Sequence, residues 1–123
     1  MKRHNVSSGS EYEATVGYSR AVRTGPYVSV AGTTGAGDGA AEQARDALRR
    51  IAIALQDVGA ALSDVVRTRI YVTDISRWSD VGAVHAEVFG DIMPVATMVE
   101  VSALIAPDHL VEIEVDAYVD GAE

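Results

Sequence analysis

No cysteine occurs in the sequence, which excludes disulfide bonds, thiolate catalysis and cysteine metal ligands. Long apolar runs are missing as well, and none approaches the roughly 20 residues that span a bilayer. The N-terminal stretch MKRHNVSSGSEYE contains no apolar segment of the kind found in a secretory signal. Together these absences lead us to expect a cytoplasmic protein that does not contact a membrane.

Basic residues are scarce compared with acidic ones. The 10 lysines and arginines stand against 18 aspartates and glutamates, which gives a net charge of −8. Binding to the phosphate backbone of a nucleic acid needs a basic surface, so the charge argues against nucleic acid as the main partner. It does not exclude a small anionic ligand in a locally basic pocket.

The length and composition are those of an ordinary globular protein. Its 123 residues are 48% apolar and 23% charged, and this length and composition are typical of a single domain with one core. No internal repeat and no linker divides the sequence. We therefore assign residues 1–123 to one domain.

Turn residues and alternation predict a β-hairpin near the N-terminus. The segment GYSRAV alternates and places Tyr18 and Arg20 on one face. A second strand is predicted over residues 27–33, and the turn Thr-Gly-Pro at residues 24–26 joins the two. A short additional strand at residues 3–6 is also considered, whereas the rest of the first 15 residues is polar and weakly patterned.

Helical periodicity predicts two helices. The first covers residues 40–58, with Asp38 as its candidate N-cap and Gly59 as its candidate stop. The second, shorter helix covers residues 75–90. The apolar stripe of the first helix consists of Ala44, Leu48, Ile51, Ala52, Leu55 and Val58.

Three more strands complete the expected α+β fold, in which two helices cover one face of a mixed sheet. They lie at residues 64–74, 93–101 and 110–119, and the first of them is expected to turn Val66 and Ile70 toward the core. The opposite face then carries Arg20, Arg67, Arg69, Tyr71, Glu112 and Glu114. Such a polar face suits a subunit interface or a ligand cleft, so we infer obligate assembly.

The motifs that usually identify a catalytic class do not settle the function. The loop GTTGAGDG fits neither a phosphate-binding loop of the Walker type nor the dinucleotide fingerprint, so we favour a crossover loop. His4, His85 and His109 lack metal-ligand spacing, and there is no G-x-S-x-G for a serine nucleophile. We expect no metal and no other cofactor.

Two glutamates share one face of the last strand, and two interpretations remain open for them. Glu112 or Glu114 could be a carboxylate that moves protons or orients water. Alternatively, both could pair with Arg67 and Arg69 across neighbouring strands. The residues alone favour the pairing.

Five segments in this order resemble the Rid (reactive intermediate deaminase, YjgF-type) family: VGYSRAV, YVSVAGTTG, VVRTRIYVTDISRW, PVATMVEV and LVEIEVDAYV. The resemblance covers residues 16–119. It implies a chorismate-mutase-like α+β fold, a homotrimer whose sheets pack as a central barrel, and ligand clefts between neighbouring subunits. It also implies hydrolysis of reactive enamines or imines to 2-keto acids and ammonia without a cofactor.

The resemblance assigns site residues one by one. Tyr18 matches the family's pocket tyrosine, Gly32 the glycine whose N–H faces the ligand, and Glu112 the glutamate that positions the hydrolytic water. Ala96 stands where deaminating members carry the arginine that binds the substrate carboxylate. We place Ala96 and Met98 on the cleft-lining strand, and take Glu112 as the catalytic residue.

The position of the missing family arginine raises a question about Arg20. This residue could supply an anion contact from another wall of the cleft, or it could pair with Glu114 or Asp116 at the subunit interface. For the whole protein the leading expectation is an imine or enamine deaminase with a small-molecule substrate. A non-catalytic trimer that binds a small metabolite is the alternative, and a ribonuclease or translation inhibitor comes third.

Overall fold

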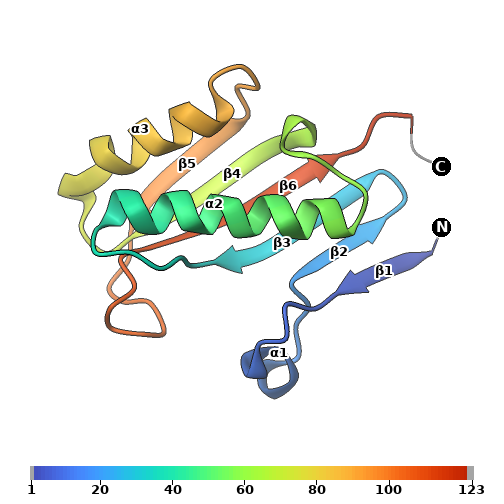
Figure 1. Ribbon diagram of the computed structural model, residues 1–123, viewed down its shortest axis with the longest axis horizontal. Helices are drawn as coiled ribbons and strands as arrows, with labels where there is room; N and C mark the ends of the chain where they lie inside the picture. The colour runs from blue at the N-terminus through green and yellow to red at the C-terminus, as the bar shows by residue number, and fades with distance from the viewer. Residues whose placement is uncertain (1, 122–123) are drawn as a thin grey trace.

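The computed structural model describes residues 2–121 and contains one six-stranded sheet. Its strands are β1 (Arg3–Val6), β2 (Ala21–Thr24), β3 (Tyr27–Thr33), β4 (Val65–Val72), β5 (Val95–Glu100) and β6 (Val111–Tyr118). Their order across the sheet is β1-β2-β3-β6-β4-β5 (Figure 1). Only β4 and β5 are parallel, and the other neighbouring strands are antiparallel. The predicted hairpin of β2 and β3 is confirmed.

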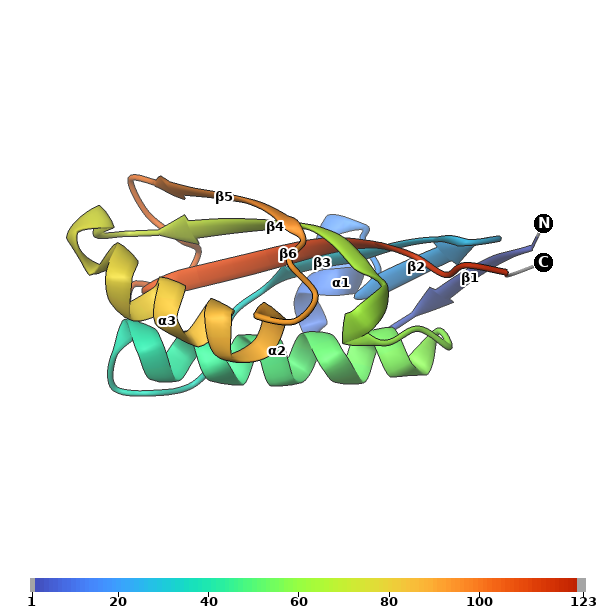
Figure 2. The same cartoon turned by 90° about the horizontal axis from the view of Figure 1, so that it is seen from above.

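Two long helices cover a single face of this sheet. They are α2 (Ala40–Asp57) and α3 (Trp78–Phe89), and Figure 2 shows both on the same side, with the opposite face of the sheet uncovered. Leu48, Ile51 and Phe89 from the helices pack with Ile113 and Val115 of β6 in the buried core. Burying the apolar stripe of each helix against the sheet explains the two layers. The expected α+β architecture is therefore confirmed.

Short helices complete the chain. They are α1 (Glu11–Val16) and two single 3₁₀ turns, η1 (Leu62–Asp64) and η2 (Ile75–Arg77). The second predicted helix thus begins as a 3₁₀ turn and becomes α-helical only at Trp78. Within residues 2–121 no helix is both long and apolar enough to cross a bilayer.

The predicted C-terminal end of α2 is correct, but its predicted N-cap is not. Gly59, just beyond the helix, has φ 77°, a left-handed conformation that glycine adopts without strain and that ends helices. At the other end Gly39 is the N-cap, and Asp38 lies one residue outside the helix. The prediction of Asp38 as N-cap was wrong, and the Asp38 N–H instead donates to the Glu42 carboxylate at 3.2 Å.

Helix α1 was not predicted, although the sequence carries a signal for it. Ser10 and Glu13 have the S-x-x-E spacing of a capping box. The Ser10 hydroxyl caps the helix by accepting from the Tyr12 N–H, while the Glu13 carboxylate turns back to Ser8. The same region corrects a second prediction, because strand β2 starts at Ala21, within the predicted segment GYSRAV and not at its beginning.

Strand β4 also differs from the prediction at its first residues. The pairing of β4 with β6 shifts register between Val65 and Arg67, as in a β-bulge. This shift turns Val65 into the core and leaves Val66 51% exposed. The expectation that Val66 faces the core was therefore wrong, whereas Thr68, Ile70 and Val72 are buried as expected.

Candidate ligand-binding site

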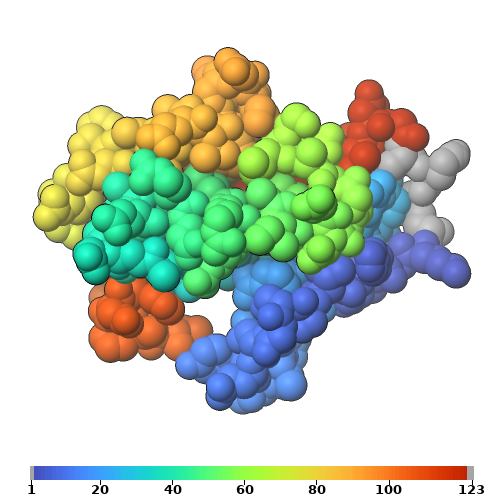
Figure 3. Space-filling view, viewed as in Figure 1, coloured from blue at the N-terminus to red at the C-terminus, as the bar shows by residue number. Residues whose placement is uncertain are grey.

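A cavity lies beside the C-terminal half of β3. It has a volume of about 900 Å³ and is bounded by α1, the C-terminal half of β3, α2 and the loop at residues 101–110. On the surface this region is a notch between the blue N-terminal segment and the orange loop (Figure 3). Tyr18, Arg20, Gly32 and Glu112, four of the residues predicted for the site, line this cavity.

A bulge in β3 shapes the cavity wall. Val30 pairs with Val115 and Thr33 pairs with Ile113, so two residues of β3 stand opposite one residue of β6. The extra residue changes the alternation of β3, and Thr33 becomes buried. Gly32 consequently lies against the side chain of Glu112.

The absence of a side chain at Gly32 is required by this packing. A Cβ added to Gly32 would collide with the Glu112 carboxylate, at Oε2 and also at Cδ and Cγ. Glycine therefore lets the Glu112 carboxyl lie directly on the backbone of β3. Gly32 and Glu112, both predicted for the site, are therefore direct neighbours in the structure.

Arg20 is held against the bulge by several hydrogen bonds. Its Nη1 donates to the carbonyl of Gly32 and to the hydroxyl of Thr33, both at 2.9 Å, and more weakly to the Ala31 carbonyl. Its Nη2 donates to the Tyr18 hydroxyl at 3.4 Å, and the guanidinium lies 5.6 Å from the centre of the Tyr18 ring. Within residues 2–121 the Arg20 Nε–H has no hydrogen-bond partner.

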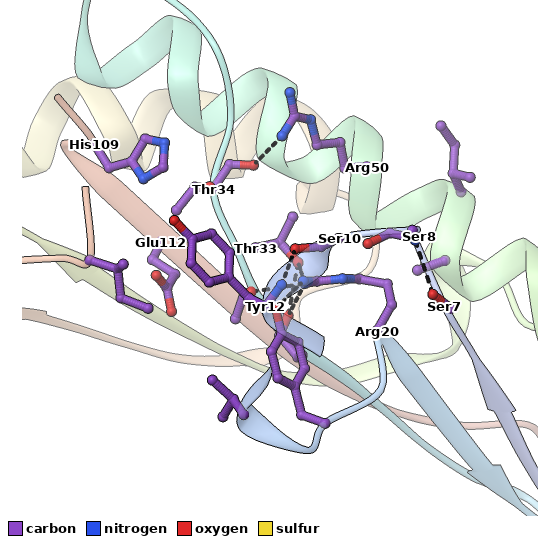
Figure 4. A pocket seen from close by; sticks show the side chains of 18 of the residues that line it. Ser7, Ser8, Ser10, Tyr12, Arg20, Thr33, Thr34, Arg50, His109 and Glu112 are labelled. Atoms are coloured by element: carbon purple, nitrogen blue, oxygen red, sulfur yellow. Dashed lines mark hydrogen bonds between the residues drawn. The ribbon is translucent and has the colours of Figure 1, made fainter. Parts of the chain in front are cut away.

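The electrostatics of Glu112 are set by burial. Partial burial raises the pKa of the Glu112 carboxyl, and the repulsion from Glu114 adds to this, while His109 and Arg20 offset part of it. A carboxyl whose pKa is raised toward neutrality can exchange a proton with a ligand more readily than an ordinary surface glutamate. Figure 4 shows Glu112 and His109 on one side of the cavity and Arg20 on the other.

The loop that carries His109 is fastened by Gln43, a residue that the sequence reasoning missed. The buried Gln43 amide donates to the carbonyls of Gly37 and Asp108, and its oxygen accepts from the Leu110 N–H at 2.8 Å. These bonds tie the glycine-rich loop to the loop at residues 101–110. No sequence signal pointed to Gln43, because its partners lie far away along the chain.

The opposite rim of the cavity depends on Glu13 of α1. The Glu13 carboxylate accepts from the hydroxyl of Ser8 at 2.6 Å and from the Ser8 N–H at 3.0 Å. Hydrogen bonds from Ser8 and Ser7 lower the pKa of Glu13 to about 2, and the charge of Arg20 contributes in the same direction. The carboxylate therefore stays ionised and fixes the Ser/Gly loop beside the cavity.

The second alternative for Arg20 does not occur within one chain. Among residues 2–121, Glu114 and Asp116 pair with Arg69, whose Nη1 lies 3.4 Å and 3.1 Å from their carboxylate oxygens. The Tyr71 hydroxyl donates to Glu114 at 2.5 Å, and this bond raises the pKa of Tyr71. The cross-strand pairing predicted from the sequence thus applies to Glu114, whereas Glu112 forms no ion pair among these residues.

Ala96 and Met98, the other two predicted site residues, do not line this cavity. They lie on β5 opposite Thr68 and Ile70, on the side of the sheet that the helices cover. β5 is the edge strand farthest from β1 in the sheet. Within one chain the structure therefore does not bring Ala96 and Met98 together with Glu112.

Across residues 2–121 no group of three or more His, Asp or Glu side chains is arranged to hold a metal ion. The chemistry that this cavity offers is that of its own side chains. These are two carboxyl groups, of which Glu112 has a raised pKa, two arginines, one histidine and the hydroxyl groups of serines, threonines and tyrosines.

Comparison with known proteins defines the class. Residues 8–119 match the family model described as Endoribonuclease L-PSP. The crystal structure of Rv2704 from Mycobacterium tuberculosis, a member of the YjgF/YER057c/UK114 family, superimposes with a TM-score of 0.95 and 72% identity, covering 96% of this chain and 100% of that one. The fold and the matched residues therefore define a protein of the YjgF type.

Two curated proteins are similar to this chain in sequence. An uncharacterized protein of Streptomyces coelicolor is 36% identical over 121 residues, covering 92% of this chain and 90% of its own length. The 3-aminoacrylate deaminase RutC of Acinetobacter baylyi is 36% identical over 80 residues, covering 65% of this chain and 63% of its own. The chain belongs to the Rid/YjgF family, also described as Endoribonuclease L-PSP.

Proposed function

We propose that this protein is a cofactor-independent hydrolase of the Rid family that converts a reactive imine or enamine into a carbonyl compound and ammonia. The observation that carries the proposal is the Glu112 carboxyl, which has a raised pKa and lies on the cavity wall against the Gly32 backbone. The relative named 3-aminoacrylate deaminase acts on a substrate of this chemical class.

The proposed reaction needs proton transfers in two directions. An enamine first accepts a proton on carbon and becomes an iminium ion, the protonated imine. Water then adds to the C=N carbon while Glu112 takes one of its protons, which leaves a neutral amino alcohol. Glu112 gives this proton to the nitrogen, ammonia leaves as the C=O bond forms, and the hydroxyl proton is released to restore the balance of protons. The sum is R₂C=NH + H₂O → R₂C=O + NH₃. A carboxyl with a raised pKa suits both directions, because its two protonation states are closer in energy at neutral pH.

The remaining side chains of the cavity bind rather than react. The Arg20 Nε–H is available for a carboxylate oxygen of the substrate, and a guanidinium is well suited to that contact. We therefore propose Arg20 as the anion contact that replaces the arginine missing at Ala96. Tyr18 supplies an aromatic wall that its contact with Arg20 holds in place.

Assembly is part of the proposal. We expect a homotrimer in which the uncovered face of the sheet is buried and each cleft lies between subunits. The polar network of Arg69, Tyr71 and Glu114 on that face supports this, since such a face is neither a core nor a freely hydrated surface. A partner subunit could then bring its Ala96 and Met98 to the cavity, which they do not reach within one chain.

Two other functions remain as alternatives. A trimer that binds a small metabolite without turnover would use the same cavity, and the small Ala96 side chain favours it over standard 2-imino-acid deamination. The ribonuclease activity in the family's name is the third, and the net charge of −8 disfavours it because RNA binding needs a basic surface.

The decisive experiment measures ammonia release above the spontaneous rate from imines generated in situ by an amino-acid oxidase. We expect Glu112→Gln to lower the catalysed rate by about 100-fold or more, the usual contribution of general acid–base catalysis. Glu87→Gln is the matched control, because Glu87 is an exposed carboxylate paired with Arg45 on the helices, away from the cavity. It should leave the rate unchanged.

Each alternative predicts a different result in this assay or in parallel assays of ligand binding and RNA degradation. Saturable binding of an imine or keto acid with no ammonia release in the parent protein would reject the hydrolase in favour of the binder. Equal rates for the parent and Glu112→Gln would remove Glu112 from the mechanism. RNA degradation that is lost in the Glu112→Gln variant would support the ribonuclease.

A further inference from the structure

His109 differs in its surroundings from the other two histidines of the chain. The His85 ring on α3 forms a hydrogen bond of 2.9 Å with the Thr68 hydroxyl on β4. His4 is exposed on the edge strand β1. His109 is partly buried and lines the cavity, and its ring has no hydrogen-bond partner among residues 2–121. Both of its ring nitrogens are therefore available to a ligand or to water.

The backbone on both sides of His109 is held in place. The buried Gln43 amide donates to the Asp108 carbonyl at 3.0 Å and accepts from the Leu110 N–H at 2.8 Å. The His109 N–H itself donates to the Ala106 carbonyl at 3.1 Å. Buried hydrogen bonds of this kind make a loop rigid, and a reacting side chain must be held in a fixed position. The loop therefore presents His109 to the cavity as a positioned group.

His109 and Glu112 lie on the same side of the cavity, as Figure 4 shows. The positive charge of a protonated His109 favours the ionised form of Glu112 and so offsets part of the rise in its pKa that burial causes. The two side chains thus influence each other, although no hydrogen bond joins them within residues 2–121. A ligand in contact with Glu112 would also lie beside His109.

The charged groups that face His109 come from β6, α2, the turn before β2 and two loops. They are Arg20, Arg50, Asp57 and Glu112 in the cavity, and Asp38, Arg50 and Asp108 in a smaller neighbouring cavity of about 590 Å³ that His109 also lines. Of these residue types only histidine normally changes its charge between about pH 5 and 8. Because His109 lines both cavities, water in the smaller one can exchange protons with its ring.

Two proton transfers of the proposed reaction have no residue assigned to them. One supplies the proton that turns the enamine or imine into the iminium ion, and the other removes the hydroxyl proton as the C=O bond forms. We propose that His109 performs both transfers. This inference rests on the proposed function and goes beyond it, because there Glu112 alone reacts.

The protons balance over one turnover. The imidazolium of His109 gives its proton to the enamine carbon, or to the nitrogen of an imine, and becomes neutral. Water adds to the C=N carbon as Glu112 takes one proton, and Glu112 returns this proton to the nitrogen, so that the C–N bond breaks and ammonia leaves with its electron pair. The neutral imidazole then takes the hydroxyl proton as the C=O bond forms. Both residues regain their starting protonation states.

The test is the rescue of ammonia release in the full-length His109→Ala variant by free imidazole. We expect His109→Ala to lower the catalysed rate by about 100-fold, the usual contribution of general acid–base catalysis, and added imidazole to raise it again by about tenfold or more. His4→Ala is the matched control, because His4 is exposed and lines neither cavity. It should keep the parent rate with and without imidazole, after hydrolysis by imidazole alone is subtracted.

A second variant tests the titration of His109 directly. His109→Gln keeps a polar side chain of similar size but cannot carry the proton. The ratio of the parent rate to the His109→Gln rate should therefore change between about pH 5 and 8, where histidine titrates. The titration of the substrate cancels in this ratio, and a purely structural role would leave the ratio constant.

The outcomes separate this inference from the proposed function. No ammonia release by the parent protein would reject both. Ammonia release that is lost in Glu112→Gln but retained in His109→Ala would support the hydrolase and overturn the role of His109. A loss in a folded His109→Ala variant that imidazole does not reverse would overturn it as well. If the melting temperature shows that His109→Ala has lost its fold, His109→Gln decides, and a constant rate ratio overturns the inference.

Discussion

The two ends of the uncovered face of β6 use the same residue type in different ways. Glu114 lies between Arg69 and Tyr71, and Asp116 shares Arg69 and also accepts from the Ser29 hydroxyl at 3.0 Å. Glu112, two residues before Glu114, reaches the cavity and contacts the backbone of Gly32 instead. One end of the strand is a closed network of charges, and the other leaves a carboxyl group available to a ligand.

The difference between Glu112 and Glu114 originates in the two strands that flank β6. β3 contains the bulge that turns Gly32 toward Glu112 and that Arg20 braces from the other side. β4 supplies Arg69 and Tyr71 only to Glu114 and Asp116. A carboxylate satisfied by its own chain contributes to stability, whereas one that lacks such partners has a raised pKa and can react.

The largest expected effect on the function of Glu112 comes from Gly32→Ala. The added methyl group would displace the Glu112 carboxyl, which is the end of a flexible side chain, so the fold should survive. A misplacement of about 1 Å can lower a rate by about 100-fold, and we expect a loss of ammonia release of about 10- to 100-fold. Gly39→Ala, where an added Cβ meets open space among the described residues, should keep its activity.

A normal rate in Gly32→Ala would show that the position of Glu112 relative to β3 is irrelevant to catalysis. Circular dichroism and thermal unfolding of both variants would establish that neither change acts through loss of the fold. The proposed mechanism requires a rate loss in Gly32→Ala with a melting temperature close to that of the parent.

The second prediction concerns the closed network. Arg69→Ala removes the cation between Glu114 and Asp116, and we expect the free energy of unfolding to fall by about 1 kcal/mol, since the pair is only partly buried. Arg67→Ala is the matched control on the same strand, because Arg67 is exposed and forms no ion pair within residues 2–121. Urea unfolding of the two variants at equal protein concentration gives the comparison, and equal losses would contradict it.

These contrasts explain how much the sequence could predict. Strand β6 was predicted because its alternation of apolar and acidic residues is local, and the same is true of the stripe on α2. The difference between Glu112 and Glu114 depends on partners in β3 and β4 that lie more than 40 residues away, so periodicity could not distinguish them. Val66 was placed wrongly for a related reason, since a bulge shifts the alternation without leaving a mark in composition.

Some residues of the cavity were predicted from the sequence and others were missed. Family resemblance pointed to Tyr18, Gly32 and Glu112, which line one cavity, and the alternation of the first strand drew attention to Arg20. The exposed apolar side chains of Tyr12, Val16, Ile53 and Ile105 at the cavity were missed because they come from α1, α2 and a loop, and only the folded chain places them together. Ser10 and Glu13 did carry a local signal for α1 that could have been used.

A third prediction follows from the raised pKa of Glu112. A carboxyl whose pKa is higher in the folded than in the unfolded chain binds a proton more tightly when folded, so its ionisation lowers stability as the pH rises through this range. Glu112→Gln should therefore melt at a higher temperature than the parent at pH 7, and the difference should disappear below about pH 4, where both states are protonated. A variant that is less stable than the parent at pH 7 would contradict the assignment.

The last prediction concerns Tyr71→Phe. This change removes the hydroxyl that donates to Glu114 but keeps the ring, and we expect a loss of about 0.5–1.5 kcal/mol of stability, the net value of one hydrogen bond. Tyr118→Phe is the matched control, because its ring packs edge-on against Tyr27 and its hydroxyl has no hydrogen-bond partner among residues 2–121. If Glu114 serves only structure, ammonia release should be unchanged in both variants. A rate loss in Tyr71→Phe would instead mean that the closed network influences Glu112, two residues away, and that the two ends of β6 are coupled.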